Sequence, residues 1–167
     1  MLRKTLTSWL FVLLIATTAS AQGNIFLVRH AERADTAGGA APMMATDPNL
    51  SDAGRQRAES LVAILKDAGI RSIYTTEFKR TQETAAPLAK ALGITLTTVP
   101  AKDTAGLVQK LKSATANVLV VGHSNTVPEI VKALGITTPL KIEDAEYDNL
   151  LIVPSVPQPQ LIRLRYR

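Results

Sequence analysis

Polar side chains follow three short apolar runs of the sequence, at the point where each run ends. Arg29 and His30 follow the first run, residues 75–80 follow the second, and Gly122-His123-Ser124 follows a later one. The chain holds only two histidines, and both belong to these groups. One histidine alone is more often structural than catalytic, but two at equivalent places favour a shared chemical role.

These residue types suit the transfer of a phosphoryl group. Arg29 and Arg80 carry permanent charges on planar forks of N–H donors, which match the oxygens of a phosphate. One neutral imidazole could attack phosphorus directly, because histidine is a competent nucleophile near pH 7. The other imidazole would then stabilise the charge that spreads over the equatorial oxygens in the transition state.

A reaction of this kind needs neither a metal ion nor another cofactor. His30, Glu32 and His123 could be proposed as three ligands of a zinc ion. The charges of Arg29 and Arg80, however, would repel a cation from the same place. We therefore expect no metal and no cofactor at this site.

The surrounding sequence alternates between strand and helix patterns. Apolar runs predict strands over 24–28, 71–75, 94–99, 118–121, 149–153 and 161–166. Helical spacing predicts helices from the N-cap Ser51 to Gly69 and over 78–92, 104–111 and 127–134, and residues 35–48 are expected as a loop. This order predicts an α/β fold, a three-layer doubly wound, mostly parallel sheet with helices on both faces. Ligands of such sheets bind at the carboxyl ends of the strands, so the three polar groups should meet there.

The first 21 residues have the pattern of an export signal. Arg3 and Lys4 precede an apolar run over 9–16, and Ala19-Ser20-Ala21 forms a small-x-small cleavage site before Gln22. The run is short for a bilayer span, which needs about 20 residues. We expect a signal peptide over 1–21, one domain over 22–167, a periplasmic or secreted protein, and no stable membrane anchor after cleavage.

Composition narrows the classes of function. The formal net charge is +5, and without Arg3 and Lys4 it becomes +3, from 17 basic and 14 acidic residues. The basic residues are spread along the chain and only 4% of the residues are aromatic, which disfavours nucleic acid as a partner. The absence of cysteine excludes disulfides, thiol nucleophiles and thiolate metal sites.

Four segments of the chain resemble, in order, motifs of the histidine phosphatase superfamily, also called phosphoglycerate mutase-like. Leu27-Val-Arg-His-Ala-Glu32 is similar to its Arg-His-Gly start motif, with Ala31 where the family usually has glycine. Residues 49–58 resemble its Leu-Thr-x-x-Gly-x-x-Gln-Ala helix start, and residues 74–85 its second-arginine motif. Val121-Gly-His-Ser124 resembles its second-histidine motif.

The resemblance implies a role for each matched residue. His30 would be the phosphorylated nucleophile, Arg29 and Arg80 would bind the phosphoryl group, and His123 would complete the pocket. The change to Ala31 affects only how closely the backbone approaches the substrate there.

The general acid that protonates the leaving oxygen has two candidates. The family often takes this proton from a carboxylate that follows the second-arginine motif. Glu77, within that motif, is slightly favoured over Asp103, which precedes a predicted helix and could instead be a helix N-terminal charge. Some small members of the family manage without such a carboxylate.

Other charged residues have simpler interpretations. Glu32 and Arg33 could touch the substrate or form an exposed ion pair. Glu143, Asp144, Glu146 and Asp148 are expected to form a solvated acidic turn.

The sequence therefore predicts an exported, metal-independent phosphomonoesterase of the small histidine phosphatase type, with a phosphohistidine intermediate. Its partner would be a small phosphorylated substrate or a phosphoprotein, and the sequence does not decide between them. The alternative is a non-catalytic module that binds phosphorylated ligands on the same fold. A binding module needs the arginines but not a nucleophile, so His30 argues against it.

Overall fold

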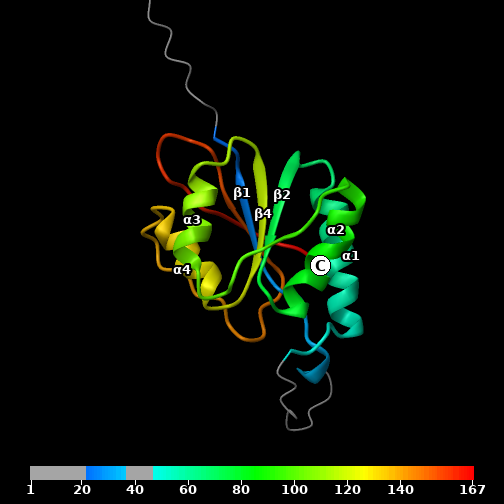
Figure 1. Ribbon diagram of the computed structural model, residues 1–167. Helices are drawn as coiled ribbons and strands as arrows, with labels where there is room; N and C mark the ends of the chain where they lie inside the picture. Colours follow the sequence, from blue (N-terminus) through cyan, green and yellow to red (C-terminus); the bar gives the residue numbers. More distant parts are fainter. Residues whose placement is uncertain (1–21, 37–46) are drawn as a thin grey trace, which may run out of the picture.

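A six-stranded sheet runs through the middle of the molecule (Figure 1). The structure is a computed structural model that describes residues 22–36 and 47–167. Strand order across the sheet is β3-β2-β4-β1-β5-β6. The strands are β1 (Ile25–Arg29), β2 (Ile70–Thr75), β3 (Thr97–Thr98), β4 (Asn117–Gly122), β5 (Asn149–Val153) and β6 (Ile162–Arg165). Strands β1 to β4 pair in parallel, while β5 pairs antiparallel with both β1 and β6.

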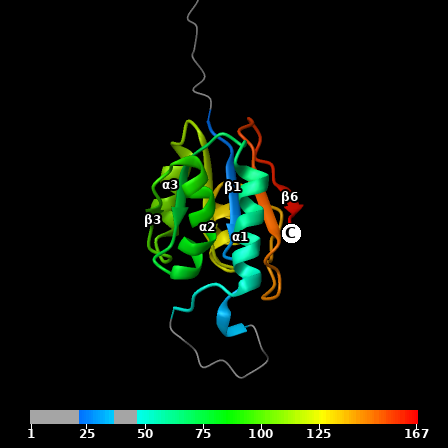
Figure 2. The ribbon, with the colours of Figure 1, turned by 90° about the vertical axis from the view of Figure 1, so that its right-hand side faces the viewer.

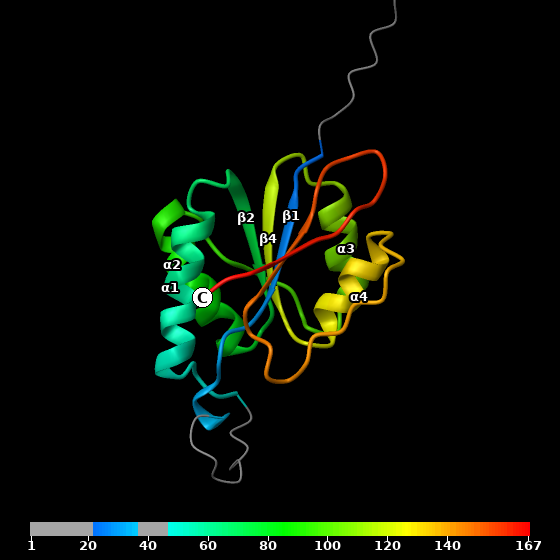
Figure 3. The same ribbon diagram turned by 180° about the vertical axis from the view of Figure 1, so that it is seen from behind.

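Helices cover both faces of the sheet (Figures 1 and 3). Helices α1 (Asp52–Leu65) and α2 (Lys79–Leu92) lie side by side on one face, which Figure 2 shows from the outside. Helices α3 (Thr104–Lys112) and α4 (Thr126–Ala133) cover the other face. The predicted three-layer α/β fold with a mostly parallel sheet is confirmed.

The two central strands explain the continuous apolar runs of the sequence. Every residue of β1 is buried, and five of the six residues of β4 are buried, because these strands are covered on both faces. Alternate side chains therefore serve two separate cores. The core beneath α3 and α4 includes Leu27, Val118, Val120, Leu111 and Ile130. The core beneath α1 and α2 includes Phe26, Val28, Leu119, Leu61 and Leu88.

The boundaries of the helices and strands follow local signals in the sequence, and two of them differ from the prediction. Ser51 caps α1 by accepting a hydrogen bond from the amide of Gly54 at 3.1 Å. The helix ends at Leu65 and not at Gly69. Gly69 belongs instead to the turn that leads into β2, where its φ of 66° suits a glycine. The strand predicted over 94–99 is only the two-residue β3, because Ile94 and Leu96 pack against the core beneath α2.

The carboxyl ends of β1, β2 and β4 lie together at one end of the sheet, the lower end in Figure 1. The predicted signal, residues 1–21, and residues 37–46 of the predicted loop lie outside the described residues. Of the helices that the structure describes, none combines the length and the apolar character required to cross a bilayer.

Candidate active site

The two histidines meet at the carboxyl ends of the central strands. Arg29 of β1 is in register with Gly122 of β4, so His30 and His123 both follow this pair. Their ring centroids are 5.4 Å apart, with one ring edge-on to the other. Both residues are buried, at 4% and 8% exposure. The parallel pairing thus brings together two residues that are 93 positions apart in the sequence.

His30 is held as a neutral imidazole. Its Nδ1 lies 2.8 Å from the carbonyl oxygen of Ala31, which can only accept, so Nδ1 carries the proton and Nε2 keeps its lone pair. Burial, together with the charge of Arg29, lowers the pKa of His30 to about 3, although the hydrogen bond to Ala31 acts in the opposite direction. His30 is therefore an unprotonated base at neutral pH, as a nucleophile requires.

His123 is oriented by a pair of threonine hydroxyls. Its Nε2 lies 3.0 Å from Oγ1 of Thr76, which in turn lies 3.0 Å from Oγ1 of Thr81 in α2. Thr81 donates to the carbonyl oxygen of Phe78 at 2.8 Å, and the Phe78 ring packs edge-on against His123. Burial lowers the pKa of His123 to about 4, and the charge of Arg80 acts in the same direction. Both histidines are thus neutral at pH 7.

Each of the two predicted phosphate-binding arginines lies over an aromatic ring. The guanidinium carbon of Arg29 is 4.2 Å from the ring centroid of Tyr147, and that of Arg80 is 4.3 Å from the centroid of Phe78. Burial lowers the pKa of Arg80, and the neighbouring charge of Arg33 contributes. The Nε–H groups of Arg29 and Arg80 are buried and have no hydrogen-bond partner among the described residues. Buried donors without acceptors beside two histidines are the chemical features of an anion site.

The two candidate acids occupy different surroundings. The carboxylate of Glu77 accepts a hydrogen bond from the amide of Ala101 at 2.8 Å, and its charge raises the pKa of His123. Asp103 caps α3 by accepting from the amide of Gly106 at 3.0 Å. The charge of Glu77 therefore acts on His123, whereas Asp103 has the helix N-terminal role that the sequence suggested.

A comparison with known proteins gives the family of this site. A family model described as histidine phosphatase superfamily (branch 1) matches residues 25–103, which include Arg29, His30 and Arg80. Residues 25–103 belong to the histidine phosphatase superfamily. The family resemblance predicted from the four motifs is therefore confirmed. No curated protein matches the chain.

Solved structures share the fold of this chain. A mycobacterial glucosyl-3-phosphoglycerate phosphatase in complex with VO3 is 14% identical with a TM-score of 0.69, over 87% of this chain and 100% of that chain. The protein histidine phosphatase SixA complexed with tungstate is 18% identical with a TM-score of 0.63, over 85% of this chain and 96% of that chain. At these identities the two likenesses show the fold.

Two residues that closely follow His30 form ion pairs. Glu32 pairs with Arg57 of α1 at 2.6 Å, and Arg57 also donates to the carbonyl oxygen of Tyr166 at 3.0 Å. Arg33 pairs with Asp35. The structure thus shows two separate ion pairs, and not the exposed ion pair of Glu32 and Arg33 that the sequence suggested. In the part of the chain that the structure describes, no group of three or more histidine, cysteine or carboxylate residues is placed to hold a metal ion.

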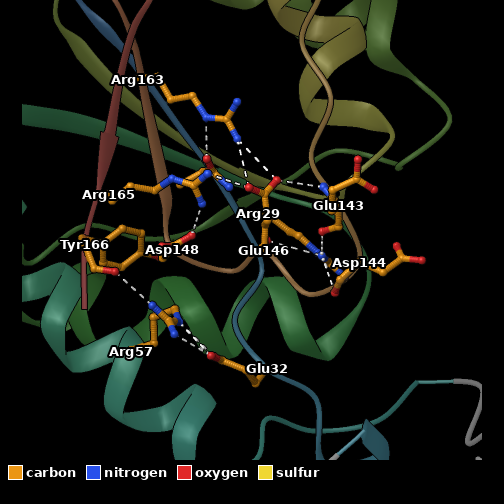
Figure 4. Close-up of polar contacts among 11 residues, drawn as sticks. Arg29, Glu32, Arg57, Glu143, Asp144, Glu146, Asp148, Arg163, Arg165 and Tyr166 are labelled. Atoms are coloured by element: carbon orange, nitrogen blue, oxygen red, sulfur yellow. Dashed lines mark hydrogen bonds and ion pairs between the residues drawn. The ribbon is translucent and has the colours of Figure 1, made fainter.

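The acidic segment before β5 contributes more to the site than the sequence suggested. Nη1 of Arg29 donates to the carbonyl oxygens of Glu143 and Asp144 at 2.9 Å and of Glu146 at 3.4 Å (Figure 4). The ring of Tyr147 packs against both Arg29 and His30, with ring centroids 6.1 Å apart in the second case. The predicted turn is present and its Glu143 and Asp144 are exposed, but the sequence did not indicate that the carbonyl groups of this turn hold Arg29. The one available signal was an aromatic residue inside an acidic segment, since carbonyl groups carry no sequence information.

Proposed function

We propose that this histidine phosphatase is an exported phosphomonoesterase that acts through a phosphohistidine on His30 without a metal ion. One arrangement carries the proposal. The Nδ1–H of His30 is bonded to a carbonyl, which leaves the Nε2 lone pair free to act as nucleophile. The charges of Arg29 and Arg80 act on the same imidazole, and their buried Nε–H donors have no acceptor among the described residues. A phosphoryl group would supply the acceptors that these donors lack.

The reaction would proceed in two displacements. In the first, Nε2 of His30 forms a bond to phosphorus while the ester P–O bond breaks, and the leaving oxygen takes a proton from a carboxylic acid, for which we favour Glu77. In the second, water attacks phosphorus, the P–N bond breaks, and the carboxylate takes a proton from the water. Arg29, Arg80 and His123 would stabilise the charge on the phosphoryl oxygens in both steps.

The neighbouring structures add support for oxyanion binding by this fold. SixA and the glucosyl-3-phosphoglycerate phosphatase were solved with tungstate and VO3, both of which are oxyanions. The proposed substrate is a small phosphorylated compound or a phosphoprotein. Export rests on residues 1–21 alone, and an N-terminus at Gln22 in the periplasmic fraction of the producing cells would support it.

The experiment that tests the function is hydrolysis of p-nitrophenyl phosphate by the purified protein in excess chelator. Wild-type protein should hydrolyse the ester, and His30→Ala should lose at least about 10³-fold in kcat/KM. The control variant Lys110→Ala, at an exposed position of α3, should match wild type. Quenching in alkaline detergent should trap an acid-labile, base-stable phosphate on wild type only. Turnover that requires an added divalent metal would contradict the metal-free mechanism. Phosphate binding without turnover of any phosphoester would support the binding module instead.

A further inference from the structure

Glu146 lies at the centre of an ion-pair network that joins the last strand to the turn around Arg29 (Figure 4). Its Oε1 lies 2.5 Å from Nη2 of Arg165, and its Oε2 lies 3.3 Å from Nη2 of Arg163. Both arginines belong to β6, and Arg163 also donates to the side chain of Asn149 in β5 at 2.7 Å. The carboxylate of Glu146 is thereby tied to the antiparallel edge of the sheet.

The same carboxylate closes the turn over residues 143–146. Oε2 of Glu146 accepts a hydrogen bond from the amide of Glu143 at 2.9 Å, and the amide of Glu146 donates to the carbonyl oxygen of Glu143, also at 2.9 Å. The hydrogen bond from Glu143 and the charge of Arg165 keep the pKa of Glu146 below its usual range, so the side chain stays ionised near neutral pH.

The carbonyl groups of this turn are what hold Arg29. Three of them converge on its Nη1, and among the ion pairs of the described residues none involves Arg29. The position of the Arg29 guanidinium therefore depends on the conformation of the turn, because no carboxylate of the described residues forms an ion pair with it. The ring of Tyr147, which follows Glu146 directly, packs against the same guanidinium.

We infer that Glu146 is a positioning residue for Arg29. By binding β6 and the amide of Glu143 at once, it fixes the turn whose carbonyls orient the Arg29 guanidinium toward the phosphoryl group. The inference rests on the proposed function only in taking Arg29 as an oxyanion ligand. It gives the C-terminal strand, which lies outside the region matched to the family, a role at the site.

Affinity for inorganic phosphate, measured by isothermal titration calorimetry, tests this inference without requiring turnover. Glu146→Ala should weaken phosphate binding by about 10-fold, within the range of coupling between contacting groups. Glu146→Gln, which keeps an oxygen acceptor but loses the charge, should weaken it by about threefold. The matched control is Asp148→Ala, because Asp148 pairs with Arg165 at 2.5 Å but its side chain has no bond to the turn. The control should bind phosphate as wild type does.

A double-mutant cycle shows whether Glu146 acts through Arg29. In an Arg29→Ala background, Glu146→Ala should cause no further loss of phosphate affinity. Equal losses in both backgrounds, or wild-type affinity in Glu146→Ala, would overturn the inference. If Glu146→Ala does not fold, wild-type affinity in Glu146→Gln would overturn it alone.

The same titrations separate this inference from the proposed function. Wild-type protein that binds phosphate but hydrolyses no ester contradicts the phosphatase and leaves the comparison of affinities intact. Wild-type protein that binds no phosphate overturns the inference about Glu146, because there is then no oxyanion site for Arg29 to serve. Where turnover is measurable, Glu146→Ala should lower kcat/KM for p-nitrophenyl phosphate by a factor similar to its loss of phosphate affinity.

Discussion

The imidazole rings of His30 and His123 lie edge to face, with centroids 5.4 Å apart, and both are buried beside Arg29 and Arg80. Two adjacent imidazoles near two permanent positive charges cannot readily take up protons. We therefore expect both to stay neutral in the folded protein at pH 5. Because the chain has no other histidines, imidazole NMR of protein purified without a histidine tag should show two rings that do not titrate between pH 7.5 and 5. A midpoint near 6.5 for either ring would contradict the buried geometry.

The same pKa values predict how stability depends on pH. Each histidine has a folded pKa, about 3 or about 4, below its unfolded value of 6.5. Well above pH 6.5 both histidines are neutral in the folded and the unfolded chain, and the free energy of unfolding has its full value. As the pH falls below 6.5, the unfolded chain binds protons that the folded chain excludes. The free energy of unfolding should fall by about 1.4 kcal/mol per pH unit for each histidine.

Urea denaturation at pH values from 7.5 to 5 measures this slope. Carboxylates titrate mainly at lower pH, so the histidines dominate in this window. The double variant His30→Gln, His123→Gln should show a much smaller slope. An equal slope in the variant would assign the pH dependence to other groups.

Tyr147 should support Arg29 through its ring and not its hydroxyl. The guanidinium carbon of Arg29 is 4.2 Å from the ring centroid, a contact that phenylalanine preserves. Tyr147→Ala should weaken binding of inorganic phosphate by about 10-fold, near the energy of a desolvated cation–π contact. Tyr147→Phe should bind phosphate within a factor of about two of wild type. A loss of equal size in Tyr147→Phe would show that the hydroxyl is the functional group.

Glu77 and Asp103 can be separated by the leaving group of the substrate. An alkyl alcohol needs a proton when it leaves, whereas p-nitrophenolate does not, so loss of the general acid should affect alkyl phosphates selectively. Glu77→Gln should lower kcat for an alkyl phosphate by about 100-fold and kcat for p-nitrophenyl phosphate far less. Asp103→Asn is the matched control, because asparagine still caps α3. The reverse result would identify Asp103 as the acid.

The hydroxyl of Tyr166 is buried without a hydrogen-bond partner among the described residues. It lies in the core beneath α1 and α2, and burial raises the pKa of Tyr166. Tyr166→Phe removes the unsatisfied group and should raise the free energy of unfolding by about 1 kcal/mol. Thermal unfolding should show a Tm higher by about 3 °C. The control is Tyr74→Phe, because the Tyr74 ring is half-buried and its hydroxyl is not among the buried groups that lack a partner. This variant should leave Tm nearly unchanged. A fall in Tm for Tyr166→Phe would contradict this account.

Local patterns in the sequence were sufficient to predict the fold and to select four residues of the candidate site. The apolar runs that end at Arg29 and Gly122 belong to neighbouring parallel strands, so the residues after them had to meet at one end of the sheet. Helix signals at Ser51 and Gly93 were equally local, because a side-chain cap and a left-handed residue act within one turn. The length of the edge strand β3 was predicted wrongly as residues 94–99. An apolar pattern does not show whether a segment pairs with a neighbouring strand or only packs against the core.

Only the tertiary structure decided what surrounds those four residues. Arg29 donates to carbonyl groups that are 114 to 117 residues away, and every residue has a carbonyl, so no residue type could mark the partners in advance. The pairing of Glu32 with Arg57, and of Glu146 with both arginines of β6, likewise depends on which elements the fold places side by side. Local sequence patterns thus indicate which groups can take part in chemistry, while contacts between distant parts of the chain determine how these groups are held.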